Sequence, residues 1–323
     1  MLRLSCSFLL AVAAIASYTT LFAEEVLLRR GDQAVEVLVG DQPFATYVFD
    51  SGGKPILWPI HGPTGALMTR SYPMAQAAGE KTDHVHQRSL WFTHGDVNGV
   101  SFWMEEGERG TIVQRDLEIK PGPPAVIETR NDWLDPQGRK LLEDRRVLAF
   151  AADGDRRAID FNITLTASAG PVKFGDTKEG TFGIRVPTSM DVEAQRGGKI
   201  VNSEGQTDVQ AWGQPASWVD YHGPVGKETL GVAVLNHPSS FHYPTRWHVR
   251  TYGLFAANPF GLKEFTENEA ADGSVTLPAG ESLTLRYRVV LHRGDAEAGQ
   301  IADQFKQYAE LSADELTSAA AAK

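Results

Sequence analysis

Strict alternation of apolar and polar side chains along two segments, residues 157–166 and 282–291, most constrains the fold. In the first segment Ile159, Phe161 and Ile163 alternate with carboxylate, amide and hydroxyl residues. A period of two places the apolar set on one face of an extended chain, so both segments predict half-buried strands. Further strands separated by short turns are predicted at residues 35–39, 45–49, 125–133 and 145–151.

Many antiparallel strands joined by short turns predict an all-β protein built as a large antiparallel β-sandwich or a closed barrel. One helix is expected at the C-terminal end, where Asp295 can cap an apolar stripe that runs to Ala309. Ser312 and Glu315 have capping-box spacing and could start a further short helix. Without a repeat or a linker, we expect one domain at 24–311 and a fraying tail at 312–323.

The first 23 residues have the features of a secretory signal peptide: Arg3, a short apolar run at 8–15, and a small residue, Ala23, before the expected cut. A retained N-terminal anchor is the alternative. Cleavage predicts a periplasmic or secreted protein, and it removes Cys6, the chain's single cysteine. Disulfides and thiol chemistry are then excluded. No later stretch is long and apolar enough for a membrane span.

The charge balance bears on the partners. The chain has 41 acidic and 31 basic side chains, a formal net charge of −10, and loss of Arg3 with the leader lowers it by one more. Such a surface repels phosphate backbones, so a nucleic-acid partner is not expected. Neither a phosphate-binding glycine loop nor a Gly-x-Ser-x-Gly elbow is present.

A histidine-rich segment, residues 83–99, breaks the strand pattern. If its first part is extended, His84, His86 and Arg88 project from one face. A His-x-His pair on a strand can supply two imidazoles to one ion, so a divalent metal is a possible cofactor. The alternative is a loop whose polar groups are bonded to neighbouring backbone.

Two later regions also carry chemistry. In residues 174–185, Glu179 follows Lys178 among glycines, and an acid beside a lysine can have its pKa tuned for proton transfer. The alternative is a charged turn with a salt bridge. Residues 218–261 mix aromatic, basic and acidic residues that suit a polyhydroxylated ligand such as a sugar. There the alternative is packing, with Trp218 and Trp247 in the core.

At these segments the sequence resembles a bacterial family known as methane oxygenase PmoA-like, over about residues 35–293. The matching motifs are Asp83-His84-x-His86-x-Arg88-x-Leu90-Trp91-Phe92, Gly95-Asp96-Val97-Asn98-Gly99 with Phe102-Trp103, Asp176-x-x-Glu179-Gly180-x-Phe182-Gly183-x-Arg185, Trp218-x-Asp220-Tyr221, and Trp247-His248-x-Arg250-x-Tyr252-Gly253-x-Phe255. Where family members carry histidine and glycine, this chain has Gln87 and Ser89. The resemblance implies an exported β-sandwich of the large type called a mutarotase-like supersandwich. Methane oxidation is not expected, since a membrane-bound oxygenase subunit needs several apolar spans.

The leading hypothesis is an exported carbohydrate-active protein that performs acid–base chemistry on a sugar or glycoside. Its catalytic candidates are His84, His86, Glu179, Asp220 and His248. Its substrate-binding candidates are Arg88, Trp91, His94, Asn98, Arg185, Tyr221, His237, Trp247, Arg250 and Tyr252. Two alternatives remain: a glycan-binding module without catalysis, and a metal-dependent enzyme that uses His84, His86 and a further histidine.

Overall fold

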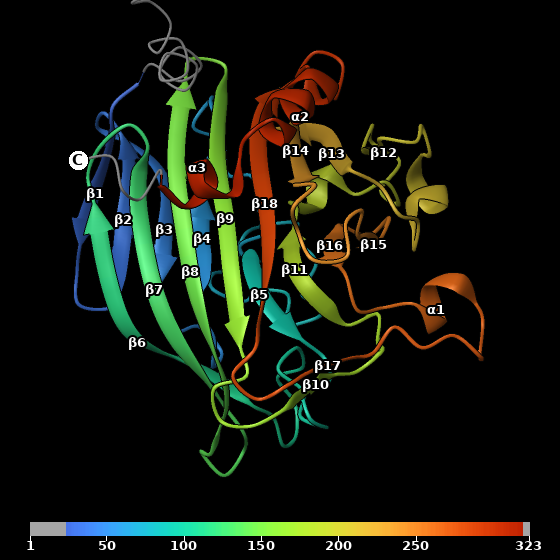
Figure 1. The fold of residues 1–323 in the computed structure, drawn as a ribbon. Helices are drawn as coiled ribbons and strands as arrows, with labels where there is room; N and C mark the ends of the chain where they lie inside the picture. Colours follow the sequence, from blue (N-terminus) through green and yellow to red (C-terminus); the bar gives the residue numbers. More distant parts are fainter. Residues whose placement is uncertain (1–23, 319–323) are drawn as a thin grey trace, which may run out of the picture.

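The computed structural model describes residues 24–318, and two eight-stranded antiparallel sheets dominate it (Figure 1). Sheet I has the strand order β1 (Val26–Arg30), β2 (Ala34–Val39), β3 (Gln42–Val48), β4 (Ile56–Ile60), β5 (Leu90–His94), β11 (Gly180–Arg185), β16 (Leu254–Asn258), β15 (Arg246–Val249). Sheet II has the order β12 (Lys199–Asn202), β13 (Trp218–Val225), β14 (Glu228–Asn236), β18 (Ser282–Arg293), β9 (Arg156–Thr166), β8 (Lys140–Asp153), β7 (Ala125–Leu134), β6 (Thr111–Lys120). The predicted all-β sandwich is confirmed.

Smaller elements complete the described chain. A two-stranded sheet pairs β10 (Val172–Phe174) with β17 (Val275–Leu277). The helices are α1 (Lys263–Thr266), α2 (Ile301–Ala309) and α3 (Ala313–Ser318), with 3₁₀ turns η1 (Thr188–Met190) and η2 (Asp208–Ala211). Among residues 24–318, no helix is long and apolar enough to cross a membrane.

The main core lies between the two sheets, and the alternating strands build it. Ile159, Phe161 and Ile163 of β9 and Leu285 of β18 belong to this core and are at most 2% exposed. β9 and β18 pair along their whole length, with Ile163 opposite Leu285. Period two therefore gives each strand one face that is fully removed from water, as the sequence predicts.

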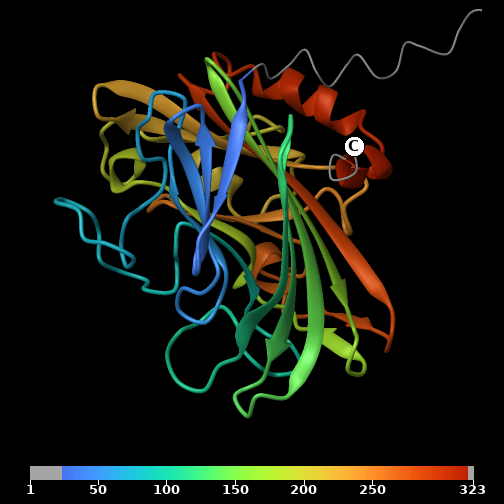
Figure 2. The same ribbon diagram turned by 90° about the vertical axis from the view of Figure 1, so that its left-hand side faces the viewer.

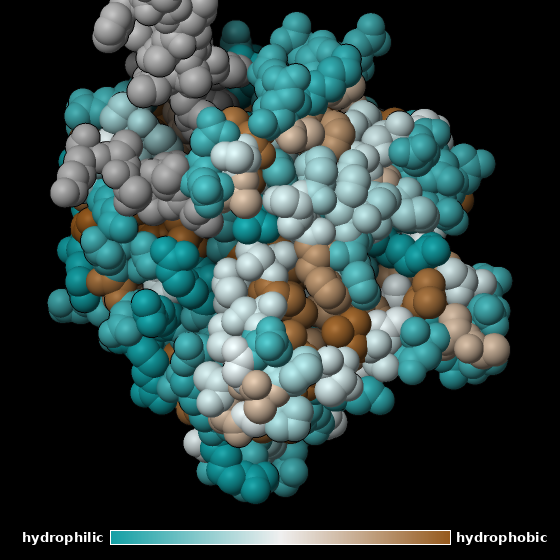
Figure 3. Space-filling model, in the orientation of Figure 1, coloured by the Kyte–Doolittle hydropathy of each residue, from teal (hydrophilic) through white to brown (hydrophobic). Residues whose placement is uncertain are grey.

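The outer faces of the two sheets are covered differently. On sheet II, α2 and α3 bury Leu235 and Val290 beneath Ile301, Tyr308 and Leu316. The outer face of sheet I is instead covered by long loops, which lie on the opposite side of the molecule from the helices (Figure 2). The face of the molecule seen in Figure 3 is mostly hydrophilic, with hydrophobic residues gathered near its centre.

The C-terminal predictions are partly confirmed. α2 begins at Ile301, not near Asp295, whose carboxylate accepts a hydrogen bond from Ala298 N in the preceding turn. The capping box is present: Glu315 N donates to Ser312 Oγ, and Ser312 N donates to the Glu315 carboxylate. Fraying from residue 312 is wrong, because α3 forms and Leu316 is 1% exposed. The predicted leader (1–23) and residues 319–323 lie outside the described chain.

Candidate active site

A row of residues across sheet I forms the base of the site. Trp91 on β5 lies opposite Gly183 on β11, Gly183 lies opposite Ala256 on β16, and Ala256 lies opposite His248 on β15. All four are on the outer face, because their neighbours Phe92, Phe182, Phe255 and Trp247 belong to the core between the sheets. Two small residues thus separate two large rings.

Glycine is required in that row by the close approach of a ring. A Cβ on Gly183 would lie 2.6 Å from the Trp91 indole. The buried ring of Trp103, from the loop after β5, fills the remaining space: its centroid is 5.2 Å from that of Trp91 and 6.5 Å from that of His248. The small residues let this loop pack onto the sheet, which brings Trp103 against His248.

The histidine pair lies in a turn and not on a strand, so the prediction of an extended 83–88 segment is wrong. Gln87 N donates to His84 O, and His84 has a φ of 46°, in the left-handed region. Buried Arg70 fixes the turn by donating to the Asp83 carboxylate at 2.5 Å and to the carbonyl of His84 at 3.0 Å. Arg185 also donates to Asp83, at 2.9 Å, and to the Gln87 side chain.

Although the strand geometry is absent, the turn still brings the two imidazoles together. The ring centroids of His84 and His86 are 5.8 Å apart. His84 stacks on Tyr252 with centroids 5.0 Å apart and an interplanar angle of 5°. Tyr252 belongs to the β15–β16 turn, where Gly253 has a φ of +104° and leaves no room for a Cβ beside Asp191.

Two of the histidines are neutral at physiological pH. Burial, together with the nearby Lys54 ammonium, lowers the pKa of His86 to about 4. Burial and the Arg250 guanidinium lower the pKa of His248 to about 3. A neutral imidazole presents one N–H donor and one acceptor nitrogen. Neither ring nitrogen of His86 has a hydrogen-bond partner within the described chain, so both are available to a ligand.

Glu179 supplies a carboxylate that has no protein partner. It lies just before β11 and is half-buried, and Gly95 N donates to its backbone carbonyl at 2.6 Å. Its carboxylate makes no ion pair or hydrogen bond with any residue of 24–318. Burial raises the pKa of Glu179 above its usual value, although the charges of Lys178 and Arg250 oppose the shift. A raised pKa and an open carboxylate suit a general acid or base.

The other carboxylates near the histidines are already engaged. Asp83 pairs with Arg70 and Arg185. Glu105 accepts two bonds of 2.7 Å from Arg88 and one of 2.5 Å from Lys54. Arg88 and Arg185, expected to orient a substrate, therefore hold the protein's own acids, which is a correction to the sequence-based assignment. Burial lowers the pKa of Lys54 to about 8, against the opposing effect of Glu105.

Buried polar atoms without partners gather on this outer face. The buried indole N–H groups of Trp58, Trp91, Trp103 and Trp212, and Nδ1 of His248, have no hydrogen-bond partner among the described residues. Leaving such a group unsatisfied costs about 1–3 kcal/mol, so each one calls for an explanation. We call the site cluster the residues His84, His86, Trp103, Glu179, His248, Arg250 and Tyr252.

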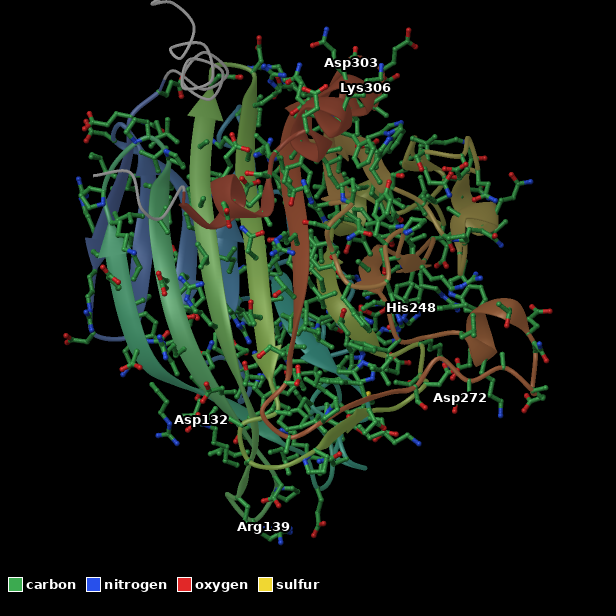
Figure 4. All side chains as sticks on the ribbon, in the orientation of Figure 1. Asp132, Arg139, His248, Asp272, Asp303 and Lys306 are labelled. Atoms are coloured by element: carbon green, nitrogen blue, oxygen red, sulfur yellow. The ribbon has the colours of Figure 1, made fainter. Side chains whose placement is uncertain are left out.

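Electrostatic coupling links the two ends of the site cluster. The charge of Arg250 affects the pKa of both Glu179 and His248, and His84 affects the pKa of both His248 and His86. Figure 4 shows His248 near β15, β16 and α1, well away from Asp303 and Lys306 of α2. The cluster thus joins four segments of the chain: the turn at 83–87, the loop after β5 that carries Trp103, the approach to β11, and the β15–β16 hairpin.

Asp220 does not share this site. It lies on β13 of sheet II, and its carboxylate bonds to His222 Nδ1 at 2.6 Å and His292 Nε2 at 2.7 Å. Its strand neighbours Val219 and Tyr221 face the core, so Asp220 points to the outer face of sheet II. The sandwich separates it from Glu179. Its expected role as the general base of the same cleft is a second correction.

Several binding candidates instead have internal partners. Trp247 is buried and donates its indole N–H to Ala216 O, and Tyr221 donates to Thr251 O beneath the β15–β16 turn. His94 is buried, with Nε2 at 2.9 Å from Gly175 O. Asn98 bonds the backbone of residues 171 and 173, and His237 packs on Tyr308 of α2. For these five the packing or loop alternative describes the geometry better.

Sequence reasoning also missed residues of the site. Arg70, Lys54 and Glu105 stand in unremarkable loop sequence, and only the folded chain shows that they surround the histidine turn. Trp212 follows η2, and Arg250 Cζ lies 5.7 Å from its ring centroid. Trp103 appears in the sequence only as part of the Phe102-Trp103 motif. An aromatic pair in a polar loop is the one local feature that indicates a buried ring there.

Two cavities of the described chain are lined by residues outside this cluster. A cavity of about 480 Å³ lies beside β1 and the loop at 121–124, where it contains the mutually paired Asp160 and Arg288. A smaller one of about 260 Å³ borders His242 and Asp272. Within residues 24–318, no three His, Cys, Asp or Glu side chains are arranged so that they could hold a metal ion.

The fold and the site define an antiparallel β-sandwich with a surface cluster of histidine, carboxylate and aromatic groups. The chain belongs to a family of unknown function, DUF6807, whose model matches residues 34–306. The resemblance to the methane oxygenase PmoA-like family is wrong, because the matching family is DUF6807 and the structural relatives reported below are of other kinds. No curated protein matches the chain.

Solved structures give distant likenesses. A GH36 α-galactosidase from Geobacillus stearothermophilus is 11% identical, with a TM-score of 0.45 over 90% of this chain and 44% of that one. A putative aldose 1-epimerase from Escherichia coli K12 is 12% identical, with a TM-score of 0.39 over 83% and 99%. A galactose mutarotase-like protein from Lactobacillus casei is 8% identical, with a TM-score of 0.39 over 83% and 100%. This chain spans less than half of the galactosidase, and TM-scores below 0.5 do not decide its function.

Proposed function

We propose that this protein is a sugar-directed acid–base enzyme whose active site is the site cluster on the outer face of sheet I. Glu179 is the base that removes a proton from a sugar hydroxyl. The neutral imidazole of His86 donates a hydrogen bond to the oxygen on which negative charge develops. The observation that carries the proposal is the Glu179 carboxylate, which is half-buried, has no bonding partner among residues 24–318 and has a raised pKa.

The aromatic groups support a sugar as the substrate. His84 is exposed and is stacked on Tyr252, while the buried ring of Trp103 lies beneath, between His86 and His248. Flat rings with polar edges contact the C–H faces of a sugar ring while nearby donors bind its hydroxyls. The neutral imidazole of His86 provides such a donor.

The number of free carboxylates favours proton transfer over glycoside hydrolysis. A glycosidase of the usual kind uses two carboxyl groups that flank the scissile bond. Here Asp83 and Glu105 are each bonded to two cations, which leaves Glu179 as the open carboxylate of the described site. One carboxylate and a neutral imidazole suffice for exchange at the anomeric centre. Glu179 takes the proton of the C1 hydroxyl while the bond between C1 and the ring oxygen breaks, which gives the open-chain aldehyde. The His86 N–H hydrogen-bonds the ring oxygen as it gains the electron pair, the proton held by Glu179 passes to that oxygen through water, and the reverse steps close the ring on either face of the aldehyde.

The test is polarimetry of freshly dissolved aldoses with wild type and with Glu179→Gln. We expect the wild type to accelerate anomer exchange for at least one aldose, and the variant to reduce kcat by about 10²–10⁴, the usual contribution of one proton-transfer group. The amide keeps the shape of the side chain but cannot accept the proton.

The matched control is Glu269→Gln, which removes an exposed carboxylate that pairs with Lys263 of α1. It should leave kcat within about twofold. If wild type accelerates no aldose, or if Glu179→Gln keeps full activity, the proposal fails. Saturable sugar binding without turnover would favour a glycan-binding module.

We also propose that the protein acts outside the cytoplasm, on the basis of residues 1–23. The N-terminal sequence of protein recovered from the native host's periplasm or medium tests this. A chain that begins at or near Glu24 is expected, whereas an intact Met1 in the cytosolic fraction would contradict export.

A further inference from the structure

Most cations around the site cluster are bonded to carboxylates. Lys54 and Arg88 share Glu105, and Arg70 and Arg185 share Asp83. These bonds are 2.5–2.9 Å long, and all four cations are buried or nearly so. These four cations therefore stabilise the fold through ion pairs with the protein's own carboxylates.

Arg250 differs from these four. Within the described chain its guanidinium makes no ion pair within 4.0 Å and no hydrogen bond; only its backbone groups are bonded. It is half-buried, so a substantial part of the side chain has left water. A guanidinium presents five N–H donors in a fixed planar fork, and here all of them are without a protein acceptor.

The Arg250 side chain is nevertheless held in place. Its Cζ lies 5.7 Å from the centroid of the Trp212 ring and 5.8 Å from that of Tyr252. Trp212 in turn packs edge-on against Phe265, with centroids 5.4 Å apart. Aromatic faces attract a guanidinium but leave its N–H edges open. Tyr252 therefore stacks on His84 and also supports Arg250, which places the unpaired cation beside the histidines.

Glu179 does not neutralise Arg250. The two affect each other electrostatically, yet no Glu179 oxygen comes within 4.0 Å of the guanidinium. A salt bridge between Glu179 and Arg250 would lower the pKa of Glu179. The pKa is instead raised, because the effect of burial exceeds that of the Arg250 charge. The Glu179 carboxylate and the Arg250 guanidinium thus both keep hydrogen-bonding groups that no residue of 24–318 occupies.

We propose that the site selects sugars that carry an anionic group, a carboxylate or a phosphate ester, and that Arg250 binds this group. The inference rests on the proposed function, and it names the substrate class of the same site. Arginine binds carboxylate and phosphate through two parallel hydrogen bonds, which a neutral hydroxyl cannot reproduce. The anion would also occupy the donors that the protein leaves open.

The experiment is isothermal titration calorimetry with matched sugars. Glucose, glucuronate and glucose 6-phosphate share one ring and differ in the anionic group, and galactose, galacturonate and galactose 6-phosphate form a second set. We expect at least one acidic sugar to bind wild type ten-fold or more tightly than its neutral counterpart. The uronate and phosphate arms show which anion the site takes.

Variants identify the residue that is responsible. Arg250→Met keeps the apolar stem and should remove the preference for the acidic sugar, while Arg250→Lys should keep part of it, because the charge remains without the fork. The matched control is Arg246→Met, which removes a half-buried guanidinium that bonds Gly213 O on the same face of β15. It should leave the preference unchanged.

The outcomes separate the two proposals. Neutral sugars that bind as tightly as acidic ones, or a preference that survives in Arg250→Met, would overturn this inference and leave the acid–base function standing. Failure of every sugar in both sets to bind would overturn both. Circular dichroism confirms that each variant is folded.

Discussion

At the scale of single residues, the histidine turn depends on one buried arginine. Arg70 is fully buried and donates to the Asp83 carboxylate and to four backbone carbonyls, those of Tyr72, Lys81, His84 and Gln87. These bonds hold His84 in the left-handed region, which a histidine does not favour. The positions of both imidazoles thus depend on a residue that touches neither ring.

Replacement of Arg70 by methionine should therefore affect both stability and activity. It leaves Asp83 with a single arginine partner and removes the Arg70 donor from each of these carbonyls, and breaking a buried, hydrogen-bonded pair costs about 3–5 kcal/mol. Urea unfolding measures the loss. Arg115→Met, which removes an exposed ion pair with Asp132, should cost less than about 1 kcal/mol. Equal losses for the two variants would show that Arg70 does not anchor the turn.

The same scale explains the expected pH dependence of turnover. Glu179 acts in its ionised form, and its pKa is raised, so activity should be lost as pH falls through a value above the usual pKa of glutamate, about 4.3. Neutral His86 requires only a pH above about 4. A kcat profile that stays flat down to pH 4 would contradict the role of Glu179 as base.

At the scale of elements, a charged network ties three strands of sheet II together. Asp220 on β13 bonds His292 on β18, and the ring of His292 lies over Gly231 of the intervening β14, where a Cβ would come within 2.2 Å. Burial opposes ionisation of both groups. The hydrogen bonds outweigh it, so the pKa of Asp220 is lowered and that of His292 is raised.

The network predicts a pH window for stability. The contribution of Asp220 is present above its unfolded pKa of about 3.9 and is lost as pH falls through its lower folded pKa. That of His292 is present below its unfolded pKa of about 6.5 and is lost as pH rises through its higher folded pKa. Asp220→Asn should therefore destabilise most between about pH 4 and 6.5, by about 3–5 kcal/mol.

Urea unfolding of wild type and Asp220→Asn at pH 5.5 and pH 9 measures this effect. The difference in unfolding free energy should shrink at pH 9, where His292 loses its charge. An equal difference at both values would show that the network is held by hydrogen bonding alone.

The sequence predicts best those strands that carry apolar side chains on one face and mostly polar side chains on the other. β9 and β18 each have one face in the core, so the alternation identifies them. β5 is buried at all five positions, because Trp91 faces Trp103 while Phe92 faces the core, and such a strand shows no alternation. The extended strand predicted for the histidine segment just before β5 is wrong, because the turn there is fixed by Arg70 and Arg185. Both arginines are distant in sequence, so the local pattern does not show their bonds.

The candidate site was predictable as a set of chemical groups but not as a geometry. His84, His86, Glu179, His248, Arg250 and Tyr252 do come together. Asp220 and His237 have equally suitable side chains, yet Asp220 lies on β13 and His237 directly after β14, both in sheet II. Which sheet a strand joins depends on long-range pairing, which the local pattern does not encode. Arg88 and Arg185 were assigned to substrate because their internal partners come from distant segments.

At the scale of the whole molecule, the outer faces of the two sheets have different roles. Helices cover sheet II and contribute stability, while the loops on sheet I carry the site cluster (Figure 2). Changes on the helical face should therefore leave ligand binding intact.

Tyr308→Ala on α2 tests this division. Its ring is buried between α2 and sheet II, so its loss should cost about 3–5 kcal/mol in urea unfolding. The Kd of the bound sugar at 25 °C should stay within about twofold, because the site lies across the sandwich. A large change in Kd with intact secondary structure would mean that the two faces are coupled.

The most direct test of the central claim is a crystal structure of the protein soaked with the sugar that binds most tightly in calorimetry. We expect electron density for the sugar over the outer face of sheet I, with one oxygen within hydrogen-bonding distance of the Glu179 carboxylate and the anionic group on Arg250. Sugar density confined to another surface, such as the Asp220 side of sheet II, would contradict the assignment of the active site.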